Sequence, residues 1–218
     1  MALIVLVRHG QASWGAADYD VLSDLGHAQA RTLGTAWRTA SFAPTRIVSG
    51  RMRRHVDTAD EIRAGLGDAP ALEPVDGLEE FDHVDVFAES VGADGSLPEL
   101  NEESMEHMFA EGLRRWISAD GSRTYRESYA EFRERVRDAF ADVRSSLDAD
   151  DRLVVATSGG VIAAIVSDLL GVAGERWPTL AAPVVNTGTS KILVRRSEPT
   201  LISFNEHAHL AANDITYA

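Results

Sequence analysis

Short runs of apolar residues alternate with amphipathic segments along most of the chain. ALIVLV (2–7) is wholly apolar, and TRIVSG (45–50) and RLVVAT (152–157) centre on β-branched residues. Runs of this length, bounded by turn or charged residues, are typical of buried parallel strands. We therefore expect three parallel strands here, and two final strands over 188–196 and 200–205.

Each of the first three strands is followed by a segment with helical character. We expect helices over 22–38, 53–66 and 160–171, and Ser23 is placed to cap the first of them. This alternation predicts an α/β fold, a three-layer αβα sandwich with a mostly parallel sheet and helices on both faces. There is no repeat or linker, so one domain over 1–218 is expected.

The middle of the chain has a different pattern. A polar, acidic segment from about 68 to 100 precedes two stripes of large apolar side chains at helical spacing. We interpret both stripes as core packing of helices in a mainly helical insertion around 82–148. The stripes are Met105, Met108, Phe109, Leu113, Trp116 and Ile117, and then Tyr129, Phe132, Val136, Phe140, Val143 and Leu147.

Composition and charge disfavour several classes of protein. The net charge of −13 argues against a nucleic-acid binder, and the absence of cysteine rules out disulfides and thiolate metal sites. No apolar run approaches the roughly 18 residues of a membrane span, and MALIVLVR lacks the basic region of a signal peptide. We expect a cytoplasmic protein without a membrane or nucleic-acid partner. The sequence does not indicate the oligomeric state.

Reactive side chains stand at the ends of the three predicted parallel strands. RHG (8–10) follows the first, SGRMRR (49–54) the second and TSGG (157–160) the third. Taken singly, each of these motifs is as typical of a turn or a solvated helix end as of a functional site. The carboxyl ends of parallel strands converge, so we expect the three motifs to lie around one point. That point would be surrounded by a histidine, arginines and a helix N-terminus. Such a point attracts a tetrahedral anion, and a neutral imidazole can accept a phosphoryl group there.

The chain resembles a known family in these segments. LVRHGQA and the downstream YDVLSDLGHAQA resemble the opening of the histidine phosphatase superfamily, the phosphoglycerate mutase-like phosphatases. That family carries an arginine four residues before a Thr-Ala pair, so Thr58-Ala59 selects Arg54 from its basic neighbours. RESYAEFRERV and SFNEHAHL resemble further family segments. The resemblance covers nearly the whole chain and implies a phosphoglycerate mutase-like fold.

The segment GLEEFDH (77–83) resembles the Leu-x-Glu segment that carries the family's proton donor. The resemblance therefore assigns that role to Glu80. Glu79 and Asp82 are close enough in sequence to share or take it.

The third strand departs from the family pattern. In the family it ends in Ser-His-Gly-Gly, and the histidine is the second of the catalytic pair, whereas Ser158 stands at that position here. Gly15 replaces an asparagine that touches the phosphate in many members. Serine is shorter but its hydroxyl still donates, and losing one such donor typically costs about 10²–10³ in rate.

Another histidine could replace the missing one. The family places His83, His207 and His209 near the pocket, although a structural role is the simpler interpretation of each. His55 is expected at the surface beside Arg54. The remaining two histidines, His27 and His107, fall on polar helix faces.

The resemblance implies a metal-free and cofactor-free phosphatase that acts on a small phosphorylated substrate. His9 would attack phosphorus, and Glu80 would protonate the leaving alcohol and then activate water. Two alternatives remain: a phosphate-binding or scaffolding protein without turnover, and a phosphoglycerate-type mutase. The sequence does not identify the substrate. The expected phosphate-binding residues are Arg8, Gly10, Arg54, Ser158 and Gly159.

Overall fold

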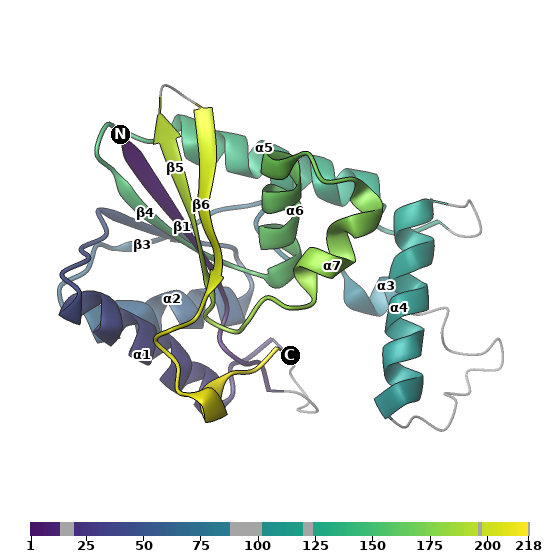
Figure 1. Cartoon of the computed structure of the whole chain (residues 1–218), viewed down its shortest axis with the longest axis horizontal. Helices are drawn as coiled ribbons and strands as arrows, with labels where there is room; N and C mark the ends of the chain where they lie inside the picture. The colour runs from purple at the N-terminus through teal and green to yellow at the C-terminus, as the bar shows by residue number, and fades with distance from the viewer. Residues whose placement is uncertain (14–19, 88–101, 120–123, 196–197, 218) are drawn as a thin grey trace.

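A six-stranded sheet forms the centre of the molecule, with strand order β3-β2-β4-β1-β5-β6. The computed structural model describes residues 1–13, 20–87, 102–119, 124–195 and 198–217, with the backbone alone at 102–106 (Figure 1). Gly15 lies outside the described residues. The strands are β1 (Ala2–Arg8), β2 (Arg46–Ser49), β3 (Leu72–Pro74), β4 (Arg152–Thr157), β5 (Thr189–Arg195) and β6 (Glu198–Glu206).

Four neighbouring strands of this sheet are parallel, so the predicted mostly parallel sheet is confirmed. β4 pairs in parallel with β1 and with β2, and β2 pairs in parallel with β3. β5 and β6 extend the sheet beyond β1 in antiparallel pairing. Arg8 at the end of β1 lies opposite Thr157 at the end of β4, and Ser49 of β2 lies opposite Ala156. The three predicted reactive segments therefore leave the sheet at one edge.

Helices cover both faces of the sheet, as the sequence predicts. Figure 1 shows α1 and α2 on one face and α5 and α6 on the other, while α4 lies beside α3 away from the sheet. The helices are α1 (Asp24–Thr39), α2 (Arg53–Leu66), α3 (His83–Phe87), α4 (Glu102–Ser118), α5 (Tyr129–Ser145), α6 (Gly159–Leu170) and α7 (Trp177–Ala181).

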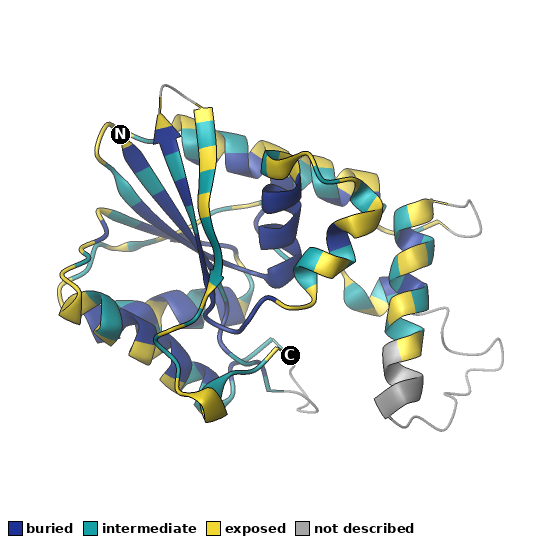
Figure 2. Ribbon diagram, viewed as in Figure 1, coloured by how far each residue is buried: buried dark blue, intermediate teal, exposed yellow. Residues whose placement is uncertain are grey.

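The apolar runs of the strands divide between two cores because successive side chains point to opposite faces. Val5 and Val7 of β1 pack with Leu33 of α1 and with Ile62 of α2. Ile4 and its neighbours on the opposite face pack with α5 and α6. Figure 2 shows β1, β4 and most of α6 as buried, which explains why these segments are almost wholly apolar.

Side-chain caps fix where two of the helices begin. The Ser23 hydroxyl accepts a hydrogen bond from Gly26 N at 3.0 Å, which confirms Ser23 as the cap of α1. Ser128 and Glu131 form a reciprocal capping box at the start of α5. In the part of the chain that the structure describes, no helix is long and apolar enough to cross a lipid bilayer.

Candidate active site

The reactive segments meet at the carboxyl edge of the sheet. His9 follows β1, and its backbone N–H donates to Thr157 O at 2.8 Å, which continues the pairing with β4. Ser158 begins α6, and Arg54 lies in the first turn of α2. The sheet register thus brings together residues that are far apart in the sequence, such as His9 and Ser158.

A cavity of about 310 Å³ opens at this edge. One end is polar and is lined by Arg8, His9, Arg54 and Glu80, with Gly159 and Gly160 of α6. The other walls are mainly apolar and come from α3, α4, α7 and the C-terminal segment. They include Phe81, Phe87, Phe109, Leu113, Trp177 and Tyr217.

The imidazole of His9 is neutral and has a fixed tautomer. His9 is 4% exposed, and burial together with the nearby positive charges of Arg54 and Arg8 lowers its pKa well below the usual value. Its Nδ1 lies 2.8 Å from Gly10 O. Because a carbonyl oxygen can only accept, the proton is on Nδ1, and the lone pair of Nε2 is available to an electrophile.

The loop that carries His9 is tied to α2 and to the C-terminal strands. Gly10 N donates to Thr58 Oγ1 at 3.0 Å, and this hydroxyl donates in turn to Arg54 O at 2.7 Å. Asn186 Nδ2 donates to His9 O at 3.0 Å. Thr58 therefore links the histidine loop to the helix turn that carries Arg54. In the sequence, Thr58 served only to select Arg54 from its basic neighbours, and Asn186 was not among the predicted residues.

The two arginines of the cavity are held by different partners. An Nη atom of Arg8 donates to Tyr217 O at 2.6 Å and also to Val184 O. Arg54 is 3% exposed, and its Nη1 lies 3.0 Å from Asp20 Oδ1. Asp20 was not among the predicted residues, and no local pattern marks it, because the contact spans 34 positions.

The other two arginines of the basic cluster point elsewhere. Arg51 is exposed and pairs with Asp76, and Arg53 is exposed and lies 3.6 Å from Asp57. Neither lines the cavity. The selection of Arg54 by the Thr-Ala pair therefore agrees with its position at the cavity wall.

We expect Arg54→Ala to weaken the binding of inorganic phosphate and of vanadate by roughly ten- to hundredfold, because a charge-assisted hydrogen bond is worth about 1.5–3 kcal/mol. Arg51→Ala and Arg53→Ala are the matched controls and should change affinity by less than about twofold. Isothermal titration of the three variants measures this. Equal losses of affinity at all three positions would mean that the arginines attract the anion only through their summed positive charge.

Glu80 presents its carboxyl group to the cavity from the loop after β3. Glu80 Oε2 accepts from Gly160 N at 2.9 Å, and Oε1 accepts from Phe81 N at 3.2 Å. Burial raises the pKa of Glu80, while these two hydrogen bonds and the charges of Arg54 and Arg8 oppose the rise. A Cβ at Gly160 would lie 2.2 Å from Glu80 Oε1, so glycine is required for this approach.

The neighbours of Glu80 do not share its position. Glu79 accepts from the backbone N–H groups of Arg51 and Gly77, at 3.1 Å and 2.8 Å. Asp82 pairs with Arg126 at 3.0 Å. Of the three acidic residues, Glu80 is the one that lines the cavity.

Phe81 anchors the Glu80 loop to a cluster of aromatic side chains. Its ring lies 4.8 Å from that of Trp116 and 5.7 Å from that of Trp177, centroid to centroid.

Phe109 and Leu113 belong to the same apolar stripe as Trp116 but line the cavity. The interpretation of that stripe as core packing therefore agrees with the burial of Trp116 and with Leu113, which packs against the same core while it also lines the cavity. Phe109 packs on Phe87 at the cavity wall.

The three candidate replacement histidines lie in different places. His83 lines the cavity, and burial and the charge of Arg54 lower its pKa. His207 and His209 lie outside the cavity: His207 Nδ1 is bound to Asn205 O and His209 Nε2 to Thr187 Oγ1. Burial lowers the pKa of His209 to about 4.

His55 is buried, and the expectation that it lies at the surface is wrong. It is 0% exposed, and its Nε2 lies 2.6 Å from Ser158 Oγ. Its ring stacks on that of His9 with centroids 5.7 Å apart. A sequence signal for its burial exists, because His55, Thr58, Ala59 and Ile62 share one helix face at i, i+3, i+4 and i+7.

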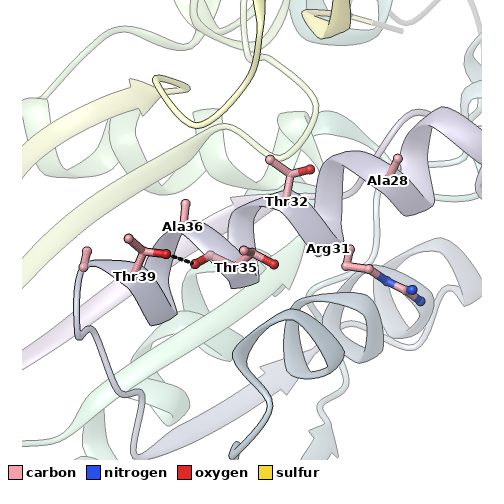
Figure 3. A pocket seen from close by; sticks show the side chains of 7 residues that line it. Ala28, Arg31, Thr32, Thr35, Ala36 and Thr39 are labelled. Atoms are coloured by element: carbon pink, nitrogen blue, oxygen red, sulfur yellow. Dashed lines mark hydrogen bonds between the residues drawn. The ribbon is translucent and has the colours of Figure 1, made fainter.

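A second hollow, of about 700 Å³, runs along the outer face of α1 (Figure 3). Its walls are methyl and hydroxyl groups of Ala28, Thr32 and Thr35, and Thr39 Oγ1 is bound to Thr35 O. The guanidinium at its rim, Arg31, pairs with Glu61 on α2. The described residues that line this hollow include no acid, histidine or other group suited to acid–base chemistry, so the candidate active site is the cavity at His9.

A neutral imidazole beside two guanidinium groups, at the carboxyl edge of an α/β sheet, is suited to a phosphorylated ligand. The family model of the histidine phosphatase superfamily (branch 1) matches residues 4–207, and the chain belongs to that family. The phosphoglycerate mutase-like fold expected from the sequence is confirmed. No curated protein sequence matches the chain.

Solved structures of similar fold include several phosphatases. A mycobacterial glucosyl-3-phosphoglycerate phosphatase in complex with inorganic phosphate is 26% identical, with a TM-score of 0.64 over 97% of this chain and 100% of that one. A phosphoserine phosphatase variant from Entamoeba histolytica in complex with phosphoserine is 22% identical, with a TM-score of 0.69 over 97% and 100%. A phosphoglycerate mutase from Bacillus anthracis is 19% identical, with a TM-score of 0.69 over 95% and 94%. Together with the family, these similarities support a phosphatase enzyme.

Proposed function

We propose that the protein hydrolyses phosphomonoesters through a phosphohistidine intermediate on His9. The observation that carries the proposal is the neutral His9 imidazole, whose proton is on Nδ1 and whose ring lines a cavity shared with Arg8, Arg54 and Glu80. The complexes of similar proteins with phosphoserine and inorganic phosphate support a small phosphorylated substrate.

The reaction has two phosphoryl transfers. In the first, the lone pair of His9 Nε2 forms a bond to phosphorus while the bond to the ester oxygen breaks, and Glu80 gives its proton to that oxygen. In the second, the Glu80 carboxylate takes a proton from water, the water oxygen attacks phosphorus, and the N–P bond breaks. Inorganic phosphate is released, and His9 and Glu80 return to their starting states. Arg8, Arg54 and the N-terminus of α6 stabilise the negative charge on the phosphoryl oxygens.

The apolar walls of the cavity favour an apolar or aromatic leaving group. The guanidinium groups among the described lining residues are Arg8 and Arg54, both at the phosphoryl end. Phe87, Phe109 and Leu113 line the cavity from α3 and α4, together with His83, whose pKa is lowered by burial. A carboxylate placed there would lose its hydration without meeting a cation, which is costly. Phosphoserine and phosphoglycerate both carry such a carboxylate, so they fit this cavity less well than an aryl phosphate.

The test is a comparison of substrates with the purified protein. We expect kcat/KM for 1-naphthyl phosphate to exceed that for phosphoserine and 3-phosphoglycerate by about tenfold or more, because an unpaired buried carboxylate costs at least about 1–3 kcal/mol. Release of inorganic phosphate is the measurement. Turnover of the carboxylated esters at the aryl rate would contradict the assignment of the leaving-group pocket.

The replacement of the family's second histidine by Ser158 favours one alternative, a phosphate-binding protein without turnover. In that case inorganic phosphate would bind, and none of the esters would be hydrolysed. The apolar leaving-group pocket does not favour the mutase, whose substrate carries a carboxylate.

We expect the rate with alkyl phosphates to fall as the pH rises through the raised pKa of Glu80. Glu80 must be protonated to act as an acid, and burial keeps it protonated to a higher pH than an ordinary glutamate. Aryl esters, whose leaving groups need less protonation, should show a weaker dependence. The measurement is kcat against pH for both ester types.

The control for this pH profile is Glu80→Gln. In this variant kcat for alkyl esters should no longer fall at high pH, and it should be lower than in the wild type by a factor of about 10²–10⁴. The substrate phosphate also titrates, with a second pKa of about 6, and this variant separates the two groups. An unchanged profile in Glu80→Gln would assign the fall in kcat at high pH to the substrate.

A further inference from the structure

The imidazole of His55 is buried with one nitrogen unsatisfied. His55 is 0% exposed, and its Nδ1 has no hydrogen-bond partner in the described part of the chain. Burying a polar atom without a partner destabilises the fold, so an apolar side chain would serve core packing better. The presence of an imidazole here therefore calls for a functional explanation.

The surroundings of His55 are shaped to hold this ring against the catalytic residues. A Cβ at Gly50 would lie 2.5 Å from His55 Nδ1 and 2.8 Å from Leu78 O, so the ring and the Leu78 backbone both require glycine there. The ring stacks on His9 with an interplanar angle of 29°. Ser158 occupies the N-cap position of α6, yet its side chain makes no capping hydrogen bond to the helix backbone. Its hydroxyl is bound to His55 Nε2 at 2.6 Å instead.

The contacts of His55 determine where its proton lies. Burial and then the charge of Arg54 lower its pKa well below the usual value, so the ring is neutral and carries one proton. A proton on Nδ1 would be a buried donor without an acceptor. A proton on Nε2 is donated to Ser158 Oγ, and the unsatisfied atom is then an acceptor, which is the better tolerated case. The Ser158 hydroxyl proton is thereby directed away from His55.

We propose that His55 is a positioning residue for phosphoryl transfer, which packs against the ring of His9 and, through the Ser158 hydroxyl, holds the start of α6 at the phosphoryl end of the cavity. The inference rests on the proposed function. Ser158 is 0% exposed and is not among the residues that line the cavity, whereas His9 and the next residue of α6, Gly159, both line it. His55 itself does not touch the phosphoryl group. His55 and Ser158, 103 positions apart, are bound to each other at the position where the family carries one histidine.

The first test is the protonation state of His55 in the wild-type protein. A long-range ¹H–¹⁵N spectrum of histidine-labelled protein should show a neutral ring with the proton on Nε2, and this signal should shift when inorganic phosphate or vanadate is added. His55→Gln assigns the signal. A proton on Nδ1, or a signal that neither anion shifts, would overturn the proposal. This measurement does not depend on turnover, so it remains decisive if the wild type hydrolyses no ester and the proposed function fails.

The second test compares two substitutions of His55 on an aryl phosphate. His55→Ala should lower kcat by about ten- to hundredfold and leave KM within about threefold, as expected when groups that act in the transition state are no longer held in place. His55→Gln keeps an amide N–H able to reach Ser158 Oγ and should recover part of the loss. Ile62→Ala, which empties a buried position on the same helix away from the cavity, controls for lost stability.

The outcomes of the second test separate a positioning role from packing. The proposal is supported if His55→Ala loses kcat and His55→Gln recovers part of it. Ile62→Ala, at a comparable melting temperature, should then show no loss of kcat. A folded His55→Gln with no better turnover than His55→Ala, or a wild-type kcat in either variant, would show that His55 only fills space.

Discussion

Replacing His9 with alanine is expected to abolish turnover while the fold and the phosphate site remain. The Nε2 lone pair of His9 forms the only covalent bond that the proposed mechanism makes between protein and phosphorus, and removal of a catalytic nucleophile typically costs about 10³-fold or more in kcat. Inorganic phosphate should still bind, because Arg8 and Arg54 are unchanged. The measurement is kcat on an aryl phosphate together with a phosphate titration and a thermal melt.

The intermediate itself provides a second readout of the His9 prediction. Wild-type protein incubated with ³²P-labelled ester and quenched in alkali, where phosphohistidine survives, should retain label, and His9→Ala should not. His207→Ala is the control, because His207 lies outside the cavity and is bound to Asn205 O. Label that remains in His9→Ala would place the intermediate on another residue and reject the mechanism.

The sequence predicted those helices and strands that are long enough to show a hydrophobic period of their own. β4 (Arg152–Thr157) and α2 (Arg53–Leu66) begin and end where the pattern places them. β3 (Leu72–Pro74) and α3 (His83–Phe87) were not predicted, because three and five residues are too short to show a period. Both elements flank the Glu80 loop, and α3 lines the cavity with His83 and Phe87, so the sequence left that cavity wall unspecified.

The residues of the candidate site also fall into those that the sequence could predict and those that it could not. His9 and Arg54 could be predicted because each stands at a fixed offset from the end of a strand or from a Thr-Ala pair. Asp20, which contacts Arg54, could not, since no local pattern records a contact between a loop and a distant helix. His55 was assigned to the surface because it follows charged Arg54 in sequence. The helical spacing of Thr58 and Ile62 was the better guide to its burial.

Restoring the family's second histidine by the single substitution Ser158→His is expected to damage the protein. Ser158 is 0% exposed, and its Oγ is already 2.6 Å from His55 Nε2, so a second ring would have to overlap the first. Overpacking of this kind costs about 1–3 kcal/mol, which lowers the melting temperature by several degrees in a chain of this size. We expect kcat on an aryl phosphate to fall as well. A raised kcat with an unchanged melting temperature would show that the space beside Ser158 is free.

The double variant His55→Ala/Ser158→His should reverse both effects. Removing the His55 ring vacates the volume that the new imidazole needs, and the new imidazole supplies a donor from the N-cap of α6, where the family carries it. Both single substitutions should therefore lower kcat, and the double variant should exceed each of them. A coupling of this sign between two positions is measured by a double-mutant cycle on kcat and on the free energy of unfolding. Additive losses would mean that the two side chains do not compete for one space, and that Ser158 replaced histidine for a reason unrelated to His55.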